Sequence, residues 1–259
     1  MPPWKLSETN YGQVKQGHYE VAVLPFGATE PHNLHLPYGT DTFECEAIGG
    51  RICEEAHRRG AKVILLPTIP YGTQTNQAKL PFGMNLDPTT LGAMVGNLVE
   101  SLVNTGIRKV VLLNGHGGND LKWVLRQWYG RTPAHLFLCN WYTVCNDLYH
   151  EIFHEPDNHA GEMETSLALA FFPDLVARNR DGSLTADEGR PATTRFEALN
   201  RGWVSITRPW HLLTTNAGVG NPHAATAEKG RRLIEKLVER LAQFLVELSA
   251  AEIDERFPY

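Results

Sequence analysis

Apolar and polar positions along the chain fall into two alternating kinds of segment. Short runs are almost continuously apolar, which predicts strands buried on both faces of a sheet. These runs span residues 19–27, 61–67, 108–115 and 135–141. Longer stretches carry apolar residues at helical spacing, and they span residues 42–58, 88–104 and 119–129. Strands that alternate with helices form βαβ units, so we expect an α/β fold with a mostly parallel central sheet and helices on both faces.

The second half of the chain adds further helices and a long irregular segment. Residues 160–171 and 223–249 show helical patterns, and the latter places leucines at four-residue spacing on one face. Residues 177–222 are rich in Gly, Pro, Arg and Thr, which predicts loops or short strands. The sequence shows no internal repeat and no linker-like tract. We therefore expect a single domain over residues 1–259.

Composition is typical of a globular protein. The chain has 259 residues, of which 42% are hydrophobic and 20% charged, and its formal charge of −5 disfavours a nucleic-acid or anionic-membrane partner. Four cysteines without a CxxC pair suit a reducing compartment better than a disulfide framework. No apolar run reaches the roughly 18 residues that a membrane span needs, and the N-terminus lacks the apolar region of a signal peptide. We expect a cytoplasmic protein with no membrane partner.

Potential metal ligands cluster directly after two of the predicted strands. In open parallel sheets, ligands bind outside the carboxyl ends of the strands. ATEPHNLHLPYGTD (28–41) follows the first strand, and NGHGGND (114–120) follows the third. The topology and the residue chemistry therefore point to the same edge of the sheet.

The first of these segments offers Glu30, His32, His35 and Asp41 within twelve residues. Residues i and i+2 of an extended segment point to opposite sides, so Glu30 and His32 suit two different metals better than one. Asp41 could bridge them. The alternative is that Asp41 only caps the helix predicted over 42–58, since aspartate is a good N-cap.

Two further segments add candidates. His116 lies between glycines, which leave its imidazole accessible; it could instead cap the next helix, or its turn could bind phosphate, although neither GxGxxG nor the Walker pattern is present. Glu162 and Glu164 are two residues apart and cannot share a helix face, and their spacing alone does not choose between them. Carboxylates and imidazoles without a nearby thiolate suit Zn²⁺ or Mn²⁺.

Taken together, these segments resemble the creatininase (creatinine amidohydrolase) family. The resemblance is carried by LPFGATEPHNLHLPYGTD (24–41), LLNGHGGN (112–119), HAGEMETSLALAFFPDLV (159–176) and NAGVGNPHAATAEKG (216–230), which occur in the family's order. It implies a three-layer α/β fold and a homo-oligomer, commonly a hexamer.

The resemblance also implies a role for each candidate. It implies two divalent metals, Zn²⁺ and/or Mn²⁺, held by two sets that share one aspartate: Glu30, Asp41 and His116 for one metal, and His32, Asp41 and Glu164 for the other. His159 matches the family's general base and proton shuttle. Trp141 matches a tryptophan that covers the substrate, and we expect Gly117 and Gly118 to contact the substrate as well. His35 is expected there too, hydrogen-bonded to a metal ligand.

The sequence departs from creatininase proper around the substrate. Creatininase carries a glutamate where this chain has Gly118, and a tryptophan where it has Glu155. The segment 73–86 lacks the family's usual histidine. The metal ligands are all retained, so we expect an amidohydrolase that acts on something other than creatinine.

The leading hypothesis is therefore hydrolysis of a non-peptide C–N bond in a small cyclic amide or formamide, by a water that two metals activate. Within the family, a formamide hydrolase of a pyrimidine or flavin precursor pathway and a peptide-maturation peptidase are alternatives. A non-catalytic small-molecule-binding protein on the same fold is an alternative of another class. A metal-dependent isomerase or phosphoesterase is less favoured, because no basic cluster surrounds the motifs.

Overall fold

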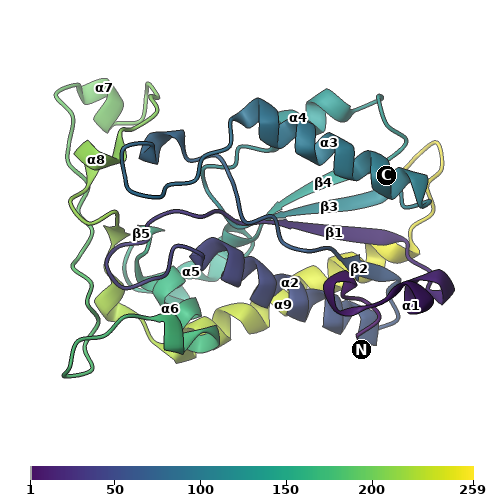
Figure 1. Ribbon diagram of the computed structural model, residues 1–259, viewed down its shortest axis with the longest axis horizontal. Coiled ribbons are helices and arrows are strands. Elements are labelled where there is room, and N and C mark those ends of the chain that lie inside the picture. The colour runs from purple at the N-terminus through teal and green to yellow at the C-terminus, as the bar shows by residue number, and fades with distance from the viewer. Residues whose placement is uncertain (1) are drawn as a thin grey trace.

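A four-stranded parallel sheet forms the centre of the computed structural model, which describes residues 2–259 (Figure 1). The strands run in the order β2-β1-β3-β4. Their bounds are β1 Val21–Phe26, β2 Val63–Leu65, β3 Lys109–Asn114 and β4 His135–Asn140. β1 pairs with β3 from Val21↔Lys109 to Phe26↔Asn114, so the two strands end at the same level. The four predicted strands are confirmed; β1, β3 and β4 are slightly shorter than their apolar runs, and β2 is less than half as long as its run.

Helices cover both faces of this sheet. α2 (Thr40–Arg58) and α9 (Ala227–Ala250) lie on one face, and α3 (Pro88–Asn104) and α4 (Lys122–Trp128) lie on the other (Figure 1). Successive strand residues point to opposite faces, and β1 accordingly sends Val23 into the core shared with α2 and α9, and Leu24 into the core shared with α3 and α4. The expected three-layer α/β architecture is confirmed.

Shorter elements complete the chain. The remaining helices are α1 Tyr11–Gln16, α5 Tyr149–Ile152, α6 Glu162–Phe171, α7 Glu197–Asn200 and α8 Trp210–Leu213. Strands β5 (Asp157–His159) and β6 (Val219–Gly220) pair antiparallel. Single 3-10 turns are η1 Leu6–Glu8, η2 Thr75–Gln77, η3 Trp141–Thr143, η4 Asn146–Leu148, η5 Pro173–Leu175 and η6 Pro222–Ala224. Residues 177–222 are mainly irregular, as their composition predicts.

The long C-terminal helix begins later than its pattern suggests. The apolar periodicity predicts a start at residue 223, whereas α9 begins at Ala227. Thr226 is the N-cap, since its hydroxyl accepts a hydrogen bond from the backbone N–H of Lys229 at 3.2 Å. Residues Pro222–Ala224 form the 3-10 turn η6 instead.

α6 packs closely on α9. This contact holds α6, which carries Glu164 and follows His159 in the chain, in place. A Cβ atom at Gly230 of α9 would lie 2.1 Å from the carbonyl oxygen of Ser166 in α6. Only glycine permits this approach, because the backbones themselves are in contact. The hydroxyl of Ser166 accepts from the N–H of Thr226 at 3.2 Å, which ties α6 to the cap of α9.

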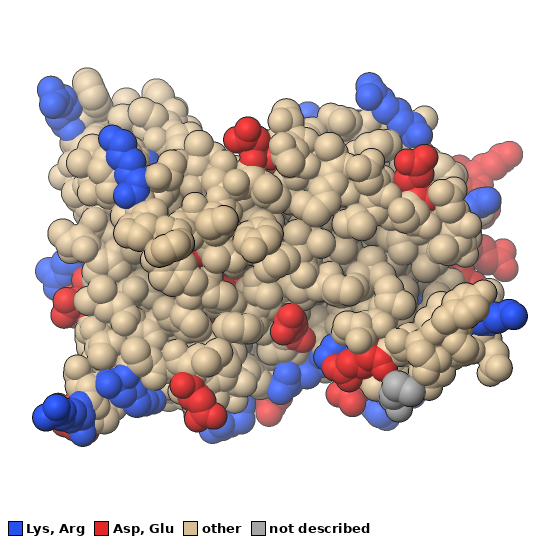
Figure 2. All heavy atoms as spheres, in the orientation of Figure 1, with Lys and Arg blue, Asp and Glu red and all other residues tan. Residues whose placement is uncertain are grey.

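The surface mixes both signs of charge. On the face drawn in Figure 2, Lys and Arg side chains lie mostly toward the margins and do not gather into one large basic patch. Within the described part of the chain, no helix combines the length and the apolar character needed to cross a bilayer.

Candidate metal centre

The candidate ligands meet at the carboxyl ends of β1 and β3, where the topology predicts a site. Glu30 and His32 lie in the loop between β1 and α2, and Asp41 lies in the first turn of α2. Gly39 is the N-cap of that helix, so the alternative reading of Asp41 as a cap is wrong. Its carboxylate is buried and points to the other candidate ligands.

Three groups of side chains could each hold a metal. Within each group the ligand atoms lie within 4.8 Å of one another. The first group is Glu30, Asp41 and His116, the second is His32, Asp41 and Glu164, and the third is Glu30, His32 and His159. The first two groups coincide with the two ligand sets that the family resemblance implies, and both contain Asp41. The third places the expected general base beside the ligands.

Backbone carbonyls orient the two ligand histidines. His32 Nδ1 donates to the carbonyl oxygen of Glu30 at 3.0 Å, which leaves Nε2 facing Asp41 Oδ1 at 2.9 Å. His116 Nε2 donates to the carbonyl oxygen of Thr73 at 3.1 Å, which leaves Nδ1 facing Glu30 Oε1 at 3.0 Å and Asp41 Oδ2 at 3.1 Å. Metal-binding histidines are normally held through their other nitrogen in this way.

The neighbouring carboxylates keep protons on these histidines when no metal is bound. Burial disfavours the charged imidazole of His32, but the carboxylates of Asp41 and Glu164 outweigh it and raise the pKa of His32 to about 10. Burial likewise opposes protonation of His116, and Glu30 and Asp41 raise its pKa well above the usual value. The site therefore stabilises positive charge between its carboxylates, and the donor set is one that divalent Zn²⁺ or Mn²⁺ would fit.

Hydrogen bonds from outside the ligand cluster position Glu30 and Glu164. The side-chain amide of Gln77 in η2 donates to Glu30 Oε2, and the backbone N–H of Ala160 donates to Glu164. Burial, together with the nearby carboxylate of Asp41, raises the pKa of Glu164 to about 7, although His32 opposes this. Gln77 was not among the residues singled out from the sequence, since an isolated glutamine in a loop carries no motif.

Glu162 and Glu164, which their spacing in the sequence could not distinguish, point in different directions from α6. Glu164 lines the cavity beside the ligand cluster, whereas the carboxylate of Glu162 is fully buried elsewhere. Glu162 accepts from the backbone N–H groups of His154 at 2.9 Å and Glu155 at 2.7 Å, and it pairs with Lys229 of α9. Its role is to bind α6 to its surroundings.

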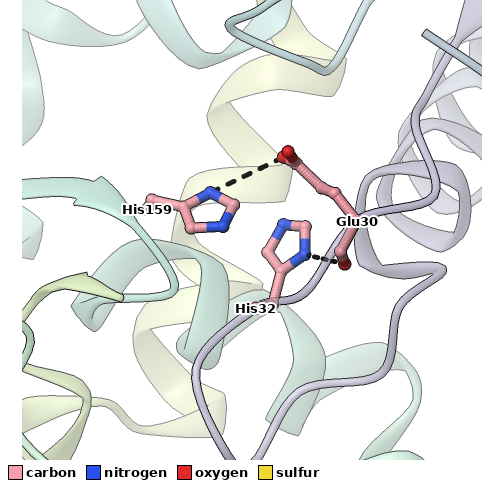
Figure 3. Close-up of side chains that lie close together, drawn as sticks. All are labelled: Glu30, His32 and His159. Carbon is pink, nitrogen blue, oxygen red and sulfur yellow. Dashed lines mark hydrogen bonds and ion pairs between the residues drawn. The ribbon is translucent and has the colours of Figure 1, made fainter. Parts of the chain in front are cut away.

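His159 at the end of β5 has one ring nitrogen occupied and one turned to the ligands (Figure 3). Its Nε2 lies 2.9 Å from the carbonyl oxygen of Pro31, which can only accept, so Nε2 carries the proton of the neutral ring. Its Nδ1 lies 3.7 Å from Glu30 Oε1. Burial, assisted by the neighbouring His32, lowers the pKa of His159. Nδ1 is therefore a proton acceptor beside the ligand cluster.

A cavity of about 380 Å³ opens onto these side chains, a volume that suits a small ligand. Besides His159 and four of the proposed ligands, its lining consists of Asn76, Gln77, Gly115, Gly117, Gly118, Tyr142, Thr143, Asn146, Tyr149, Asn158, Met163, Arg208 and Trp210. Gly117 and Gly118 thus lie where a substrate contact was expected.

Two expected substrate contacts lie elsewhere. Trp141 is only 1% exposed and packs edge-on against Tyr142, and it is not part of the cavity lining, so its assignment as a substrate cover is not supported. His35 is also absent from the lining, and its Nε2 lies 2.8 Å from the hydroxyl of Thr165 rather than from a ligand. Trp210 lines the cavity together with Tyr142 and Tyr149, and its ring lies edge-on to His159 at 4.7 Å between centroids.

Gly118 is required by the geometry around His116. A Cβ atom at this position would lie 2.1 Å from the carbonyl oxygen of Thr73 and 2.4 Å from Nε2 of His116. These are the two atoms whose hydrogen bond orients the His116 ring. A larger residue at position 118 would therefore disturb a candidate ligand directly.

Buried clusters of carboxylates and histidines that share one aspartate, at the end of a parallel sheet, are typical of metal-dependent enzymes that activate water with two metals. The family model described as "Creatininase: Creatinine amidohydrolase" matches residues 5–245. The chain therefore belongs to the creatininase family, whose members are metal-dependent amidohydrolases, and the resemblance recognised in the sequence is confirmed.

Individual relatives agree with this assignment. A mycofactocin precursor peptide peptidase of Mycobacterium ulcerans (strain Agy99) is 29% identical over 225 residues, which is 84% of this chain and 81% of the relative. A crystal structure from Bacteroides fragilis NCTC 9343, described as a candidate creatinine amidohydrolase, matches with a TM-score of 0.90 and 36% identity over 98% of this chain and 100% of that one. Two solved creatininases share the fold. The Zn–Zn type matches with a TM-score of 0.74 and 22% identity over 95% of this chain and 98% of its own. The Mn form matches with a TM-score of 0.73 and 23% identity over 96% of this chain and 99% of its own.

Proposed function

We propose that this protein hydrolyses a non-peptide C–N bond in a small cyclic amide or formamide, using two divalent metals, Zn²⁺ and/or Mn²⁺. Glu30, Asp41 and His116 would hold one metal, and His32, Asp41 and Glu164 the other. The observation that carries the proposal is the pair of buried ligand clusters that share Asp41 and adjoin one cavity. The metals named are those of the solved creatininases of Zn–Zn type and Mn form.

The chemistry follows from the parts of the site. When bound, a pair of divalent metals lowers the pKa of a water and polarises an amide carbonyl. His159 accepts the proton of the attacking water on Nδ1, which is the ring nitrogen free of the Pro31 carbonyl. It then delivers that proton to the leaving nitrogen as the C–N bond breaks. Trp210 packs against the ring of His159 and limits its movement.

The cavity supports a substrate other than creatinine. Its volume of about 380 Å³ admits a compact molecule. Gly118 stands where creatininase proper carries a glutamate, and a side chain at that position would collide with the carbonyl oxygen of Thr73. The family resemblance therefore implies that the cavity of this chain differs at this position from that of creatininase proper.

A peptidase acting in peptide maturation is the second candidate, because a mycofactocin precursor peptide peptidase is 29% identical over most of both chains. A formamide hydrolase uses the same parts. By the family resemblance, we also propose a single domain over residues 1–259 that forms a cytoplasmic homo-oligomer, a hexamer, and light scattering on the purified protein measures the subunit number.

The decisive experiment is turnover by metal-loaded protein on a panel of lactams, formamides, hydantoin-like rings and short peptides, with Asp41→Ala as the control. A product that gains one water with the wild type alone would establish amide hydrolysis and name the substrate group. Two bound metals with no product across the panel would contradict the proposed substrate class. Less than one tightly bound metal per chain after loading would favour a non-catalytic binding protein.

A further inference from the structure

We propose that Arg208 binds a carboxylate on the substrate, so that this enzyme acts on amides that carry a free carboxylate. The inference takes one thing from the proposed amide hydrolysis, which is that the amide bond to be cleaved lies beside His159. It concerns the substrate class, which the metal ligands do not determine.

Arg208 lies on the cavity without a partner of its own. It is one of the residues that line the cavity, and its side chain is exposed. Among the described residues, none forms a hydrogen bond or ion pair with its guanidinium. It is therefore available to a ligand, unlike Arg201 on the same segment, which pairs with Glu197 at 3.6 Å.

Arg208 belongs to a segment that contacts the catalytic end of the cavity. Two residues further on, Trp210 is buried and packs edge-on against His159 at 4.7 Å between ring centroids. The helix α8 that begins at Trp210 also contacts η2, which supplies Asn76 and Gln77 to the lining. A substrate whose amide lies beside His159 can therefore extend a second group toward Arg208 within the same cavity.

The charges that line the cavity favour binding of an anion beside Arg208. Among the described residues of the lining, the carboxylates are Glu30, Asp41 and Glu164, and all three are proposed metal ligands. Two divalent cations would outweigh their three negative charges. Arg208 then remains as a cation with no carboxylate to neutralise it, and the other polar lining residues outside the metal centre are neutral amides and hydroxyls.

A carboxylate fits this single guanidinium better than a phosphate does. Guanidinium binds a carboxylate through two parallel hydrogen bonds, with one positive charge facing one negative charge. A phosphate dianion would require further donors of positive charge, and the lining contains no lysine and no second arginine among the described residues. The charge and the donors of the cavity therefore favour N-formyl and other N-acyl amino acids and lactam acids.

The test compares substrates that differ only in this group. N-formyl amino acids and 5-oxoproline are assayed against their own carboxamides with wild type, Arg208→Ala and Arg208→Lys, and with Arg195→Ala as the matched control. Arg195 is an exposed arginine of the same segment that does not line the cavity. We expect the wild type to prefer the carboxylate by about tenfold in kcat/KM, mainly through KM. Arg208→Ala should remove this preference, Arg208→Lys should restore part of it, and Arg195→Ala should behave as wild type.

Binding separates this inference from the proposed reaction. The same pairs are titrated calorimetrically into metal-loaded His159→Ala protein, with and without Arg208→Ala. A carboxylate that binds about tenfold more tightly than its carboxamide only when Arg208 is present supports the inference, even if no turnover occurs and the proposed reaction fails. A preference that survives Arg208→Ala would assign the carboxylate to the metals instead. That result, equal affinity for both members, or no detectable binding of either, would overturn the inference.

Discussion

Replacing Glu162 with glutamine tests whether the two acids of α6 have the separate roles that the structure gives them. The Glu162 side chain is 0% exposed and accepts three hydrogen bonds, from Lys229 and from the backbone N–H groups of His154 and Glu155. Glutamine has the same shape but no charge, and its NH₂ group cannot accept. At least one of these donors would be left facing another donor.

The magnitude follows from burial. Removing one partner of a buried ion pair typically costs about 3–5 kcal/mol. The side chain of Lys229 is 16% exposed, so it can recover part of its hydration, and the lower end of that range applies. We expect Glu162→Gln to lower the free energy of unfolding by about 3 kcal/mol, which corresponds to a fall in melting temperature of roughly 6–12 °C.

Urea unfolding of the metal-free proteins measures this effect, and metal analysis of the loaded proteins supplies the second readout. Glu164→Gln is the matched control, because the same change occurs two residues away on the same helix. Glu162→Gln should keep the wild-type metal content with lower stability, whereas Glu164→Gln should lose about one metal per chain. The assignment of the two acids would be refuted if Glu162→Gln lost a metal while its unfolding midpoint stayed unchanged.

Three further outcomes follow from the same site. Asp41→Ala should bind less than one metal per chain, since the shared ligand of both sets is gone, and two retained metals in plasma emission analysis would contradict the bridging role. His159→Ala should keep both metals while kcat falls by about 10²–10⁴; loss of a metal would make His159 a ligand. Metal loading should release about two to three protons at neutral pH, because the raised pKa values of His32 and His116 keep both rings protonated without metal and Glu164, with its pKa raised to about 7, is partly protonated. The affinity for metal should therefore weaken as pH falls. Calorimetry in buffers of different ionisation enthalpy measures the number of protons released, and a value of zero would contradict this prediction.

The layered fold follows from local information. Each strand is a continuously apolar run, which is how a strand covered on both faces must look, and helix α3 matches its predicted bounds at Pro88 and Asn104. The start of α9 was harder to predict from the sequence, since the helical pattern extends to residues before the N-cap at Thr226. Helix ends depend on one or two hydrogen bonds, which an apolar pattern does not record.

The candidate metal centre was predictable only in part. Glu30, His32 and Asp41 follow a strand closely enough for topology to place them, and the glycines around His116 mark a turn. The choice of Glu164 over Glu162 came from family resemblance, because the partner that removes Glu162 from the site lies 67 residues further along the chain. Arg208 and Trp210 line the cavity from the irregular segment 177–222, where no periodicity indicates which side chains turn inward.

Position 118 and the segment 73–86, where the family resemblance implies departures from creatininase, are connected in space. Thr73 begins that segment, and its carbonyl oxygen accepts the hydrogen bond that orients His116. The same carbonyl oxygen would lie 2.1 Å from a Cβ atom at position 118. A glutamate there requires the segment to move away, whereas Gly118 allows it to pack against His116 and to bring Gln77 onto Glu30. Gly118 and the segment 73–86 are therefore coupled in this structure, because the Thr73 carbonyl oxygen and the Gln77 side chain contact His116 and Glu30, two of the candidate metal ligands.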